Sequence, residues 1–473
     1  MINCELDFLK SATATDSNVF SNADVLRWIQ DRRNAIQTAV EQIPLDQLRG
    51  WRVEELTGNI KHESGGFFTI EGIRIQTNWG HIPSWDQPII NQPEIGFLGF
   101  IAKKFSGILH FLVQAKIEPG NINIVQISPT LQATRSNYSQ VHKGKRPRYL
   151  EYFNGEHTVK PLLDQLQSEQ GARFLRKRNR NIIVELLETE VVEPHPDFVW
   201  LTIGQIKKLM CQDNIVNMDT RTVLSGIGYG SYSTDTLKGM FAMSSKSPQT
   251  QSFLESALNR EYSFNEFRSI VSWITRLKST YDLIVDRIPV NQVAQWFVRN
   301  GEIRRDDGKY FSVIGVNVSI ENREVVNWDQ PMIKPAQEGL VAFIVRPING
   351  VYHFLVQAKL EAGNFDIIEL APTVQCLTGD YRIGQNDYSV PYINEVLSAP
   401  TKSILLDVMQ SEEGGRFFKE QNRNMIVEVG EEFPLEIADN YCWLTLNQLL
   451  RLIEFNNYLN IAARSLISAI NFN

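Results

Sequence analysis

The sequence contains few cysteines, and they are widely spaced. Its 473 residues include four, Cys4, Cys211, Cys376 and Cys442, with no Cys-x-x-Cys pair and no Cys/His spacing typical of a zinc ligand set. This spacing argues against a structural zinc site and against a disulfide framework. We therefore expect no metal and interpret the cysteines as buried thiols.

The sequence also lacks an excess of basic residues and lacks long apolar runs. Acidic residues outnumber basic ones by 54 to 47, for a formal net charge of −7. Because binding nucleic acid requires a basic face, we expect no nucleic-acid partner. No apolar run reaches the roughly 18 residues of a membrane span, and Glu5 and Asp7 stand where a signal peptide would carry Lys or Arg. We expect a cytoplasmic protein without a membrane partner.

A long internal repeat dominates the sequence. Trp-Asp-Gln-Pro at 85–88 recurs at 328–331, and His-Phe-Leu-Val-Gln-Ala-Lys at 110–116 recurs at 353–359, each 243 residues later. At this spacing, 22 of the 46 positions from Trp85 to Thr130 match their counterparts. The pattern indicates an internal duplication. We expect one unit at 1–215, a Ser-, Gly- and Thr-rich linker at 216–260 and a second unit at 261–473.

Hydrophobic periodicity predicts an α+β fold with mixed sheets flanked by helices. The helices expected in the first copy run from Val25 to the Ile-Pro pair at 43–44, from 161 to 170, and from 203 to 210 with Thr202 as N-cap. The strands expected there are 67–70, 96–102, 108–117, 122–127 and 181–188.

One face of the strand at 110–116 carries His110, Leu112, Gln114 and Lys116. A single such face is more often merely solvated. Its identical recurrence in the second copy makes a ligand-facing sheet surface an equally good interpretation.

The loop at 131–152 concentrates cations, amides and phenols. Arg135, Lys143, Lys145, Arg146 and Arg148 could neutralise a diphosphate, and the tyrosines could stack on a ring. The alternative is an ordinary solvated turn. The second copy has lost most of these cations at 375–388, which favours the first copy as the catalytic one.

A second shared segment, at 168–181, repeats at 411–424. Arg173 and Asn179-Arg180-Asn181 occur in both copies. A basic helix exit, which is structural, is slightly favoured over a binding role, because cations favour helix C-termini.

At these residues the chain resembles the NDP-hexose 2,3-dehydratases of deoxysugar pathways. The resemblance rests on Pro-Thr-Leu-Gln-Ala-Thr-Arg-Ser-Asn-Tyr at 129–138, Tyr-Leu-Glu-Tyr-Phe at 149–153, Gln-Ser-Glu-Gln-Gly at 167–171 and Arg-Asn-Arg-Asn at 178–181. It implies a homodimer whose subunit contains two tandem Nudix-like units, each with a nucleotide-sugar pocket. A metal-dependent Nudix hydrolase needs a helix rich in carboxylates, and most of them are missing when its glycine is aligned with Gly171 or Gly414. Diphosphate hydrolysis is therefore disfavoured.

The resemblance implies a reaction that needs no cofactor: removal of water from carbons 2 and 3 of an NDP-4-keto-6-deoxyhexose such as a dTDP-sugar. No Gly-x-Gly-x-x-Gly fingerprint follows an expected strand, so a separate NAD(P)H-dependent ketoreductase would act downstream. The alternative is a non-catalytic nucleotide-sugar-binding protein.

Residue chemistry and the resemblance together suggest roles for individual side chains. The catalytic candidates are Tyr138, His142, Glu151 and Arg135. The substrate-binding candidates are Trp85, Gln114, Lys116, Gln132, Asn137, Tyr149, Arg173, Asn179 and Arg180 in the first copy, and Gln357, Lys359, Gln375, Tyr381, Arg416 and Arg423 in the second.

Overall fold

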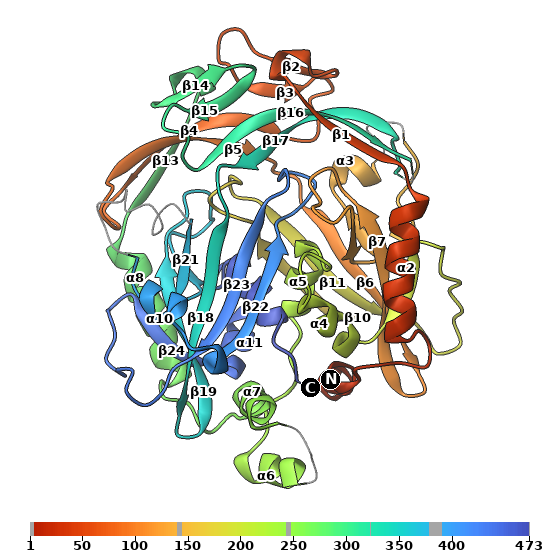
Figure 1. Cartoon of the computed structure of the whole chain (residues 1–473), viewed down its shortest axis with the longest axis vertical. Coiled ribbons are helices and arrows are strands. Elements are labelled where there is room, and N and C mark those ends of the chain that lie inside the picture. The colour runs from red at the N-terminus through yellow and green to blue at the C-terminus, as the bar shows by residue number, and fades with distance from the viewer. Residues whose placement is uncertain (1–3, 140–143, 243–246, 322, 378–389, 473) are drawn as a thin grey trace.

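The structure is a computed structural model that describes residues 4–139, 144–242, 247–321, 323–377 and 390–472. These residues form two seven-stranded and two five-stranded sheets. The fold is α+β, and Figure 1 shows the five-stranded sheets lying above the two seven-stranded ones, with the chain termini close together below.

Each copy builds one seven-stranded sheet. The first consists of β6 (Gly96–Phe105), β7 (Ile108–Ile117), β8 (Val125–Ser128), β9 (Leu131–Ala133), β10 (Lys160–Ser168), β11 (Arg178–Glu185) and β12 (Phe198–Leu201). The second consists of β18 (Gly339–Ile348), β19 (Val351–Lys359), β20 (Glu369–Ala371), β21 (Val374–Leu377), β22 (Ile404–Ser411), β23 (Gln421–Glu428) and β24 (Tyr441–Thr445). The two strand orders, β10-β11-β6-β7-β12 and β22-β23-β18-β19-β24, correspond strand by strand. Both sheets are mixed, because β11 runs parallel to β6 and β23 parallel to β18 while the other pairs are antiparallel.

The five-stranded sheets exchange a strand between the copies. One contains β2 (Trp51–Val53), β3 (Ile60–His62), β4 (Thr69–Thr77) and β5 (Ser84–Asn91) of the first copy with β13 (Leu283–Ile288) of the second. The other contains β14 (Trp296–Arg299), β15 (Glu302–Arg305), β16 (Phe311–Ile320) and β17 (Asn327–Pro335) with β1 (Thr38–Ile43) of the first. Leu283 pairs with Thr77, and Thr38 pairs with Ile320. Each half thus completes a sheet of the other.

Helices cover the sheets and join the halves. They are α1 (Cys4–Thr13), α2 (Asn22–Ala35), α3 (Arg135–Tyr138), α4 (Ile203–Met210), α5 (Met218–Ser225), α6 (Thr234–Ala242), α7 (Pro248–Leu258), α8 (Phe267–Thr280), α10 (Ile393–Leu397), α11 (Leu446–Ile453) and α12 (Ile461–Ser468). Among the described residues, no helix is both long enough and apolar enough to cross a membrane.

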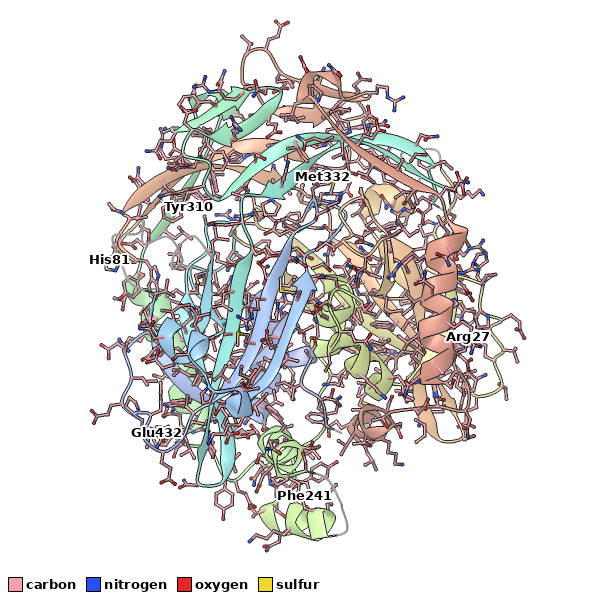
Figure 2. All side chains as sticks on the ribbon, in the orientation of Figure 1. Arg27, His81, Phe241, Tyr310, Met332 and Glu432 are labelled. Atoms are coloured by element: carbon pink, nitrogen blue, oxygen red, sulfur yellow. The ribbon has the colours of Figure 1, made fainter. Side chains whose placement is uncertain are left out.

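A single large apolar core spans both copies, and buried arginines cross it. Phe100 and Val223 of the first copy share this core with Phe343 and Leu466 of the second. Arg221 on α5 donates to the carbonyl of Ser411, and Arg464 on α12 donates to the carbonyl of Ser168. In Figure 2, Met332 lies on β17 of the upper sheets, where it is 1% exposed, whereas Arg27 points outward from α2.

Several predicted elements are confirmed. Thr202 caps α4, and its hydroxyl accepts from the backbone of Gln205 while the Gln205 side chain accepts from the Thr202 amide. The strands predicted at 96–102, 108–117, 122–127 and 181–188 appear as β6, β7, β8 and β11, with shifted ends.

The helix predicted at 161–170 is wrong, because this segment is the strand β10. Its Leu and Gln residues favour a helix locally, but pairing with the strand β11, Leu163 opposite Ile183, overrides that preference. The segment compared with the Nudix motif is therefore extended. The first helix is also shorter than predicted, since α2 ends at Ala35 and the strand β1 follows it.

The expected linker at 216–260 contains much regular structure. Every residue of α5 is buried, and α7 buries Phe253 and Leu254. Tertiary contacts with both sheets order a segment whose composition is poor in core residues.

Two expectations about burial are also corrected. Of the four cysteines only Cys442 is buried, and Cys211 is exposed. The solvated interpretation of the β7 face is wrong, since only Gln114 of its four residues is partly exposed. Leu112 lies in an apolar core, and His110 is 3% exposed and contacts the Ser17 hydroxyl at 2.7 Å.

Candidate functional site

Two related cavities lie at the ends of the seven-stranded sheets. The first cavity, about 230 Å³, opens beside β6, β7, β9 and β11 of the first copy. The second cavity, about 530 Å³, opens beside the corresponding strands of the second copy. Each cavity takes part of its wall from the other copy, since Trp328 and Arg416 line the first and Trp85 and Arg173 line the second.

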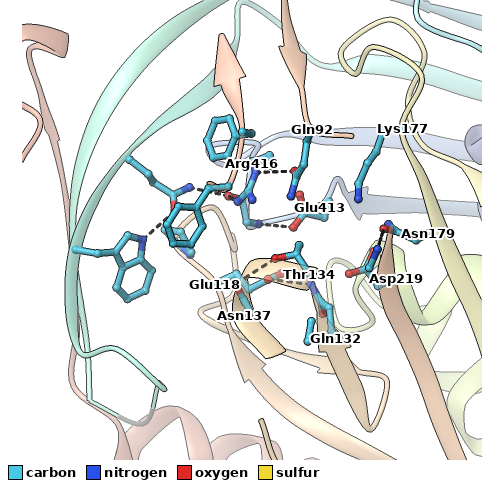
Figure 3. Close-up of a pocket in the computed structure, with 18 of the residues that line it drawn as sticks. Gln92, Glu118, Gln132, Thr134, Asn137, Lys177, Asn179, Asp219, Glu413 and Arg416 are labelled. Atoms are coloured by element: carbon cyan, nitrogen blue, oxygen red, sulfur yellow. Dashed lines mark hydrogen bonds between the residues drawn. The ribbon is translucent and has the colours of Figure 1, made fainter. Parts of the chain in front are cut away.

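Aromatic side chains form one wall of the first cavity. The rings of Trp51 and Phe68 lie 4.8 Å apart, and those of His62 and Phe67 lie 4.7 Å apart. The Arg416 guanidinium stacks over Phe68 at 4.2 Å and donates to Gln92 Oε1 at 3.3 Å (Figure 3). This wall offers a flat apolar surface and a fixed cation to a ring-bearing anionic ligand.

Four carboxyl groups and the buried Lys177 also line the first cavity. The carboxyls belong to Glu118, Glu169, Asp219 and Glu413. Figure 3 shows Lys177, Asp219 and Glu413 pointing into the same space. Glu169 and Asp219 are only 5% and 2% exposed, yet Glu169 Oε2 and Asp219 Oδ1 have no hydrogen-bond partner. Such buried unpaired oxygens are costly unless a ligand or a proton satisfies them.

Burial shifts the pKa values of these groups toward neutrality. It lowers the pKa of Lys177 to about 8, although the Glu169 charge partly offsets the effect. Burial and the Glu118 charge raise the pKa of Glu413 to about 8. Burial and the Glu413 charge raise the pKa of Asp219 well above its ordinary value. The cavity therefore holds groups that can gain and lose protons near pH 8.

Neighbouring amides hold the carboxyls in place. Gln132 Nε2 donates to Glu118 Oε1 at 2.9 Å, and Asn217 Nδ2 donates to Gln132 Oε1 at 3.0 Å. Asn179 Nδ2 donates to Glu169 Oε1 at 2.5 Å. Lys116 Nζ donates to the Gln132 carbonyl at 3.1 Å. This network orients the acid/base groups without neutralising them.

The second cavity keeps Lys359, Glu361 and Glu412 at the places of Lys116, Glu118 and Glu169, but three other positions differ. At the spacing of 243 residues, Asp219 corresponds to Ala462, Lys177 to Glu420 and Glu413 to Gln170. Burial raises the pKa of Glu420 to about 7, but no lysine occupies the place of Lys177. The two cavities are thus unequal. Among the described residues, no group of three or more His, Cys, Asp or Glu side chains is arranged to hold a metal ion.

The structure brings nine of the predicted binding residues to these cavities. Those at the first cavity are Lys116, Gln132, Asn137, Asn179 and Arg416. Those at the second cavity are Trp85, Arg173, Lys359 and Gln375.

Arg180, Arg423 and Gln357 line neither cavity. Arg180 forms a two-pronged ion pair with Asp164 at 2.6 and 2.7 Å, and Arg423 does the same with Asp407 at 2.6 and 2.8 Å. Gln357 Nε2 donates to the Pro372 carbonyl at 2.8 Å. These contacts tie the three side chains to neighbouring segments of the sheets.

The basic loop lies mostly outside the two cavities. Arg135 is exposed, and Tyr138 packs on Phe97 with ring centroids 5.4 Å apart. Tyr149 and Glu151 line a separate surface hollow. Gln114 lines a third cavity of about 380 Å³, beside Lys145, Arg146 and Arg148. His142 and Tyr381 fall outside the described residues.

Sequence reasoning missed the carboxyl groups and the lysine. Glu118 and Glu169 each recur in the second copy, as Glu361 and Glu412, so the repeat did contain a signal for them. Lys177 was assigned to a helix exit, and Asp219 fell in the expected linker. Neither position could be linked to a site without the fold.

The duplicated α+β halves hold two unequal cavities, and each cavity contains carboxyl groups whose pKa burial raises. A family model described as NDP-hexose 2,3-dehydratase matches residues 22–227 and again residues 267–470. The chain belongs to this family, and the double match agrees with the internal duplication.

Curated relatives match over nearly the whole chain. A dTDP-4-dehydro-6-deoxy-alpha-D-glucopyranose 2,3-dehydratase of Saccharopolyspora spinosa is 43% identical over 98% of this chain and 94% of its own length. A protein of the same description from Amycolatopsis orientalis is 41% identical over 98% of this chain and 92% of its own length. Another from Streptomyces violaceoruber is 40% identical over 94% of this chain and 95% of its own length.

Proposed function

We propose that the chain removes water from carbons 2 and 3 of an NDP-4-keto-6-deoxyhexose, and that the first cavity is the site of this reaction. The relatives are described by the same reaction on a dTDP-sugar. The observation that supports the first cavity is Lys177, which lies there beside buried carboxyl groups, whereas Glu420 takes its place in the second cavity.

The reaction needs a base, an acid and donors for an enolate. The 4-keto group acidifies the proton on carbon 3, so a base can remove that proton and leave an enolate. The enolate electrons then form the carbon 2–carbon 3 double bond, the bond from carbon 2 to its hydroxyl breaks, and a protonated group turns the departing hydroxyl into water. The resulting enol takes a proton at carbon 2 and becomes a 3,4-diketo-2,6-dideoxy sugar. No electron acceptor is consumed.

Lys177 has the properties of the base. Its pKa of about 8 leaves roughly a tenth of the side chain neutral at pH 7, so a lone pair is available. Its Nζ already donates to the Glu94 carbonyl, which fixes the amine in the cavity. The Arg416 guanidinium and the Gln92 amide supply donors for developing negative charge.

The test is direct incubation with dTDP-4-keto-6-deoxyglucose. We expect the sugar nucleotide to lose 18 mass units and, in deuterated water, to gain deuterium at carbon 2. Lys177→Gln should abolish turnover, whereas Glu420→Gln, at the corresponding place in the second cavity, should keep it. Tight binding of the substrate by the wild type without mass loss or label would refute the proposal.

The rival is a nucleotide-sugar-binding protein without catalysis. A binding protein would not need a lysine buried beside carboxyl groups of raised pKa. Burying such groups lowers the stability of the protein, and binding alone does not use their proton exchange. The same incubation distinguishes the two functions.

Further properties rest on the family resemblance. We propose that the chain contains tandem Nudix-like units and that the first one, residues 1–215, provides most of the catalytic site. We also propose that the protein is a cytoplasmic homodimer and that an NAD(P)H-dependent ketoreductase acts on its product. The catalytic roles expected for Arg135, Tyr138, His142 and Glu151 stay predictions.

A further inference from the structure

Glu413 enters the first cavity from the second copy. It follows the end of β22 at Ser411, and the main chain there contacts the first copy directly, since Gly120 N donates to the Gly414 carbonyl at 2.7 Å. Figure 3 shows the Glu413 side chain reaching the centre of the cavity beside Arg416. The residue therefore belongs to the second half by sequence and to the first cavity by position.

The carboxyl of Glu413 shares a small space with the carboxyl of Glu118. Gly415 N donates to Glu413 Oε1 at 3.0 Å. A Cβ atom at Gly415 would lie 2.3 Å from Glu413 Oε1 and 3.3 Å from Glu118 Oε1, so both oxygens flank the same glycine. Two carboxylates this close disfavour double ionisation, and one of them keeps a proton.

The second cavity shows what the first would be without this group. There Glu361 takes the place of Glu118, but Gln170 takes the place of Glu413. Gln170 Nε2 donates to Glu412 Oε2 at 2.5 Å. An amide can form this hydrogen bond, but it cannot deliver a proton to a leaving group.

We propose that Glu413, supplied by the second copy, is the catalytic acid that protonates the hydroxyl leaving carbon 2 in the first cavity. The proposal rests on the proposed function. It assigns the two halves of the reaction to different copies: Lys177 of the first takes the proton from carbon 3, and Glu413 of the second gives its proton to the carbon 2 oxygen. The carbon–oxygen bond then breaks, water leaves and Glu413 remains as a carboxylate.

Asp219 and Glu169 can return a proton to Glu413 after each turnover. Their unpaired oxygens face the same cavity, and burial together with the charges of Glu118 and Glu169 raises the pKa of Glu413, while Arg416 lowers it. The carboxylate formed at Glu413 is reprotonated from this cluster or from water after each turnover. The Lys177 ammonium returns its proton to the product at carbon 2 or to water.

The test compares elimination with proton exchange. In wild type we expect both loss of 18 mass units and exchange of the carbon 3 proton of unreacted substrate with deuterated water. In Glu413→Gln, kcat for elimination should fall by about 100-fold or more with KM changed less than threefold, while exchange at carbon 3 continues. Lys177→Gln should lose both signals. The matched control is Glu420→Gln, a buried carboxyl of raised pKa in the second cavity, which should keep both within threefold.

The outcomes separate the two proposals. A wild type that shows neither signal refutes the proposed function itself. If the wild type is active, two results for Glu413→Gln overturn only the role of Glu413. One is elimination within threefold of the wild-type rate, and the other is loss of elimination and exchange together. If Glu413→Gln does not fold, Glu413→Asp replaces it in the test. This variant keeps a carboxyl group and should therefore retain measurable elimination. If neither variant folds, the wild-type pH profile tests the role: kcat should fall above about pH 8, and a continued rise to pH 10 overturns it.

Discussion

Replacing Lys177 by methionine should make the protein more stable and inactive. Lys177 is 5% exposed, and burial lowers its pKa from 10.5 to about 8. A difference of about 2.5 pKa units, at roughly 1.36 kcal/mol each, means that holding the charged lysine in the cavity costs about 3 kcal/mol at pH 7. Methionine has a similar length and no charge to desolvate, so most of this cost should disappear.

The pKa difference at Lys177 also determines how the stability of the wild type changes with pH. Between about pH 8 and pH 10.5 the unfolded chain binds more protons at Lys177 than the folded chain does, so wild-type stability rises with pH across this window. The stability gap between Lys177→Met and wild type should therefore narrow from about 3 kcal/mol at pH 7 to about 1.4 kcal/mol at pH 9.5.

Urea unfolding of both proteins at the two pH values measures this gap, and the substrate incubation measures activity. A methionine variant less stable than wild type at pH 7, or a gap that stays constant up to pH 9.5, would refute the reasoning. Lys61→Met is a suitable control, because Lys61 is about one-third exposed and neither it nor its ion-pair partner Glu54 lines either cavity.

Three further predictions follow from the contacts. Tyr138→Phe should keep kcat within about twofold, because the ring packs on Phe97 outside the first cavity; a loss of 100-fold in the dehydration assay would restore its predicted catalytic role. Arg221→Met should lower the free energy of unfolding by about 2 kcal/mol in urea, because it removes three buried hydrogen bonds, to the Asn217 and Ser411 carbonyls and the Ser465 hydroxyl, and their loss outweighs the relief of no longer burying a charge; a change below about 0.5 kcal/mol would contradict this. Gly415→Ala should reduce kcat by about tenfold or more with little change in melting temperature, because the new methyl group displaces the flexible end of Glu413. An unchanged kcat would show that the position of the Glu413 carboxyl is unimportant.

Much of the fold could be predicted from local pattern. The duplication, the strands β6, β7 and β11 and the capped helix α4 follow from periodicity, turn residues and a capping threonine, which act over a few residues. The strand β10 could not be predicted in this way, because its sequence favours a helix until it meets β11.

The candidate site was predictable only in part. Lys116, Gln132 and Asn179 were found because the repeat or the family motifs marked them, and all three line the first cavity. The basic loop attracted attention through its composition, yet Arg135 is exposed and Tyr138 packs against the sheet. Composition reports which groups are present, but not which way they point.

The sequence by itself determined that there are two copies, that they share one α+β scaffold, and that they belong to the NDP-hexose 2,3-dehydratases. Only the tertiary structure decided that β1 and β13 are exchanged between the halves and that Glu413 lies in the cavity of the first copy. The physical reason is distance along the chain. Local preferences act over a few residues, whereas Lys177 and Glu413 are separated by more than two hundred residues, and only packing across the shared core brings them together.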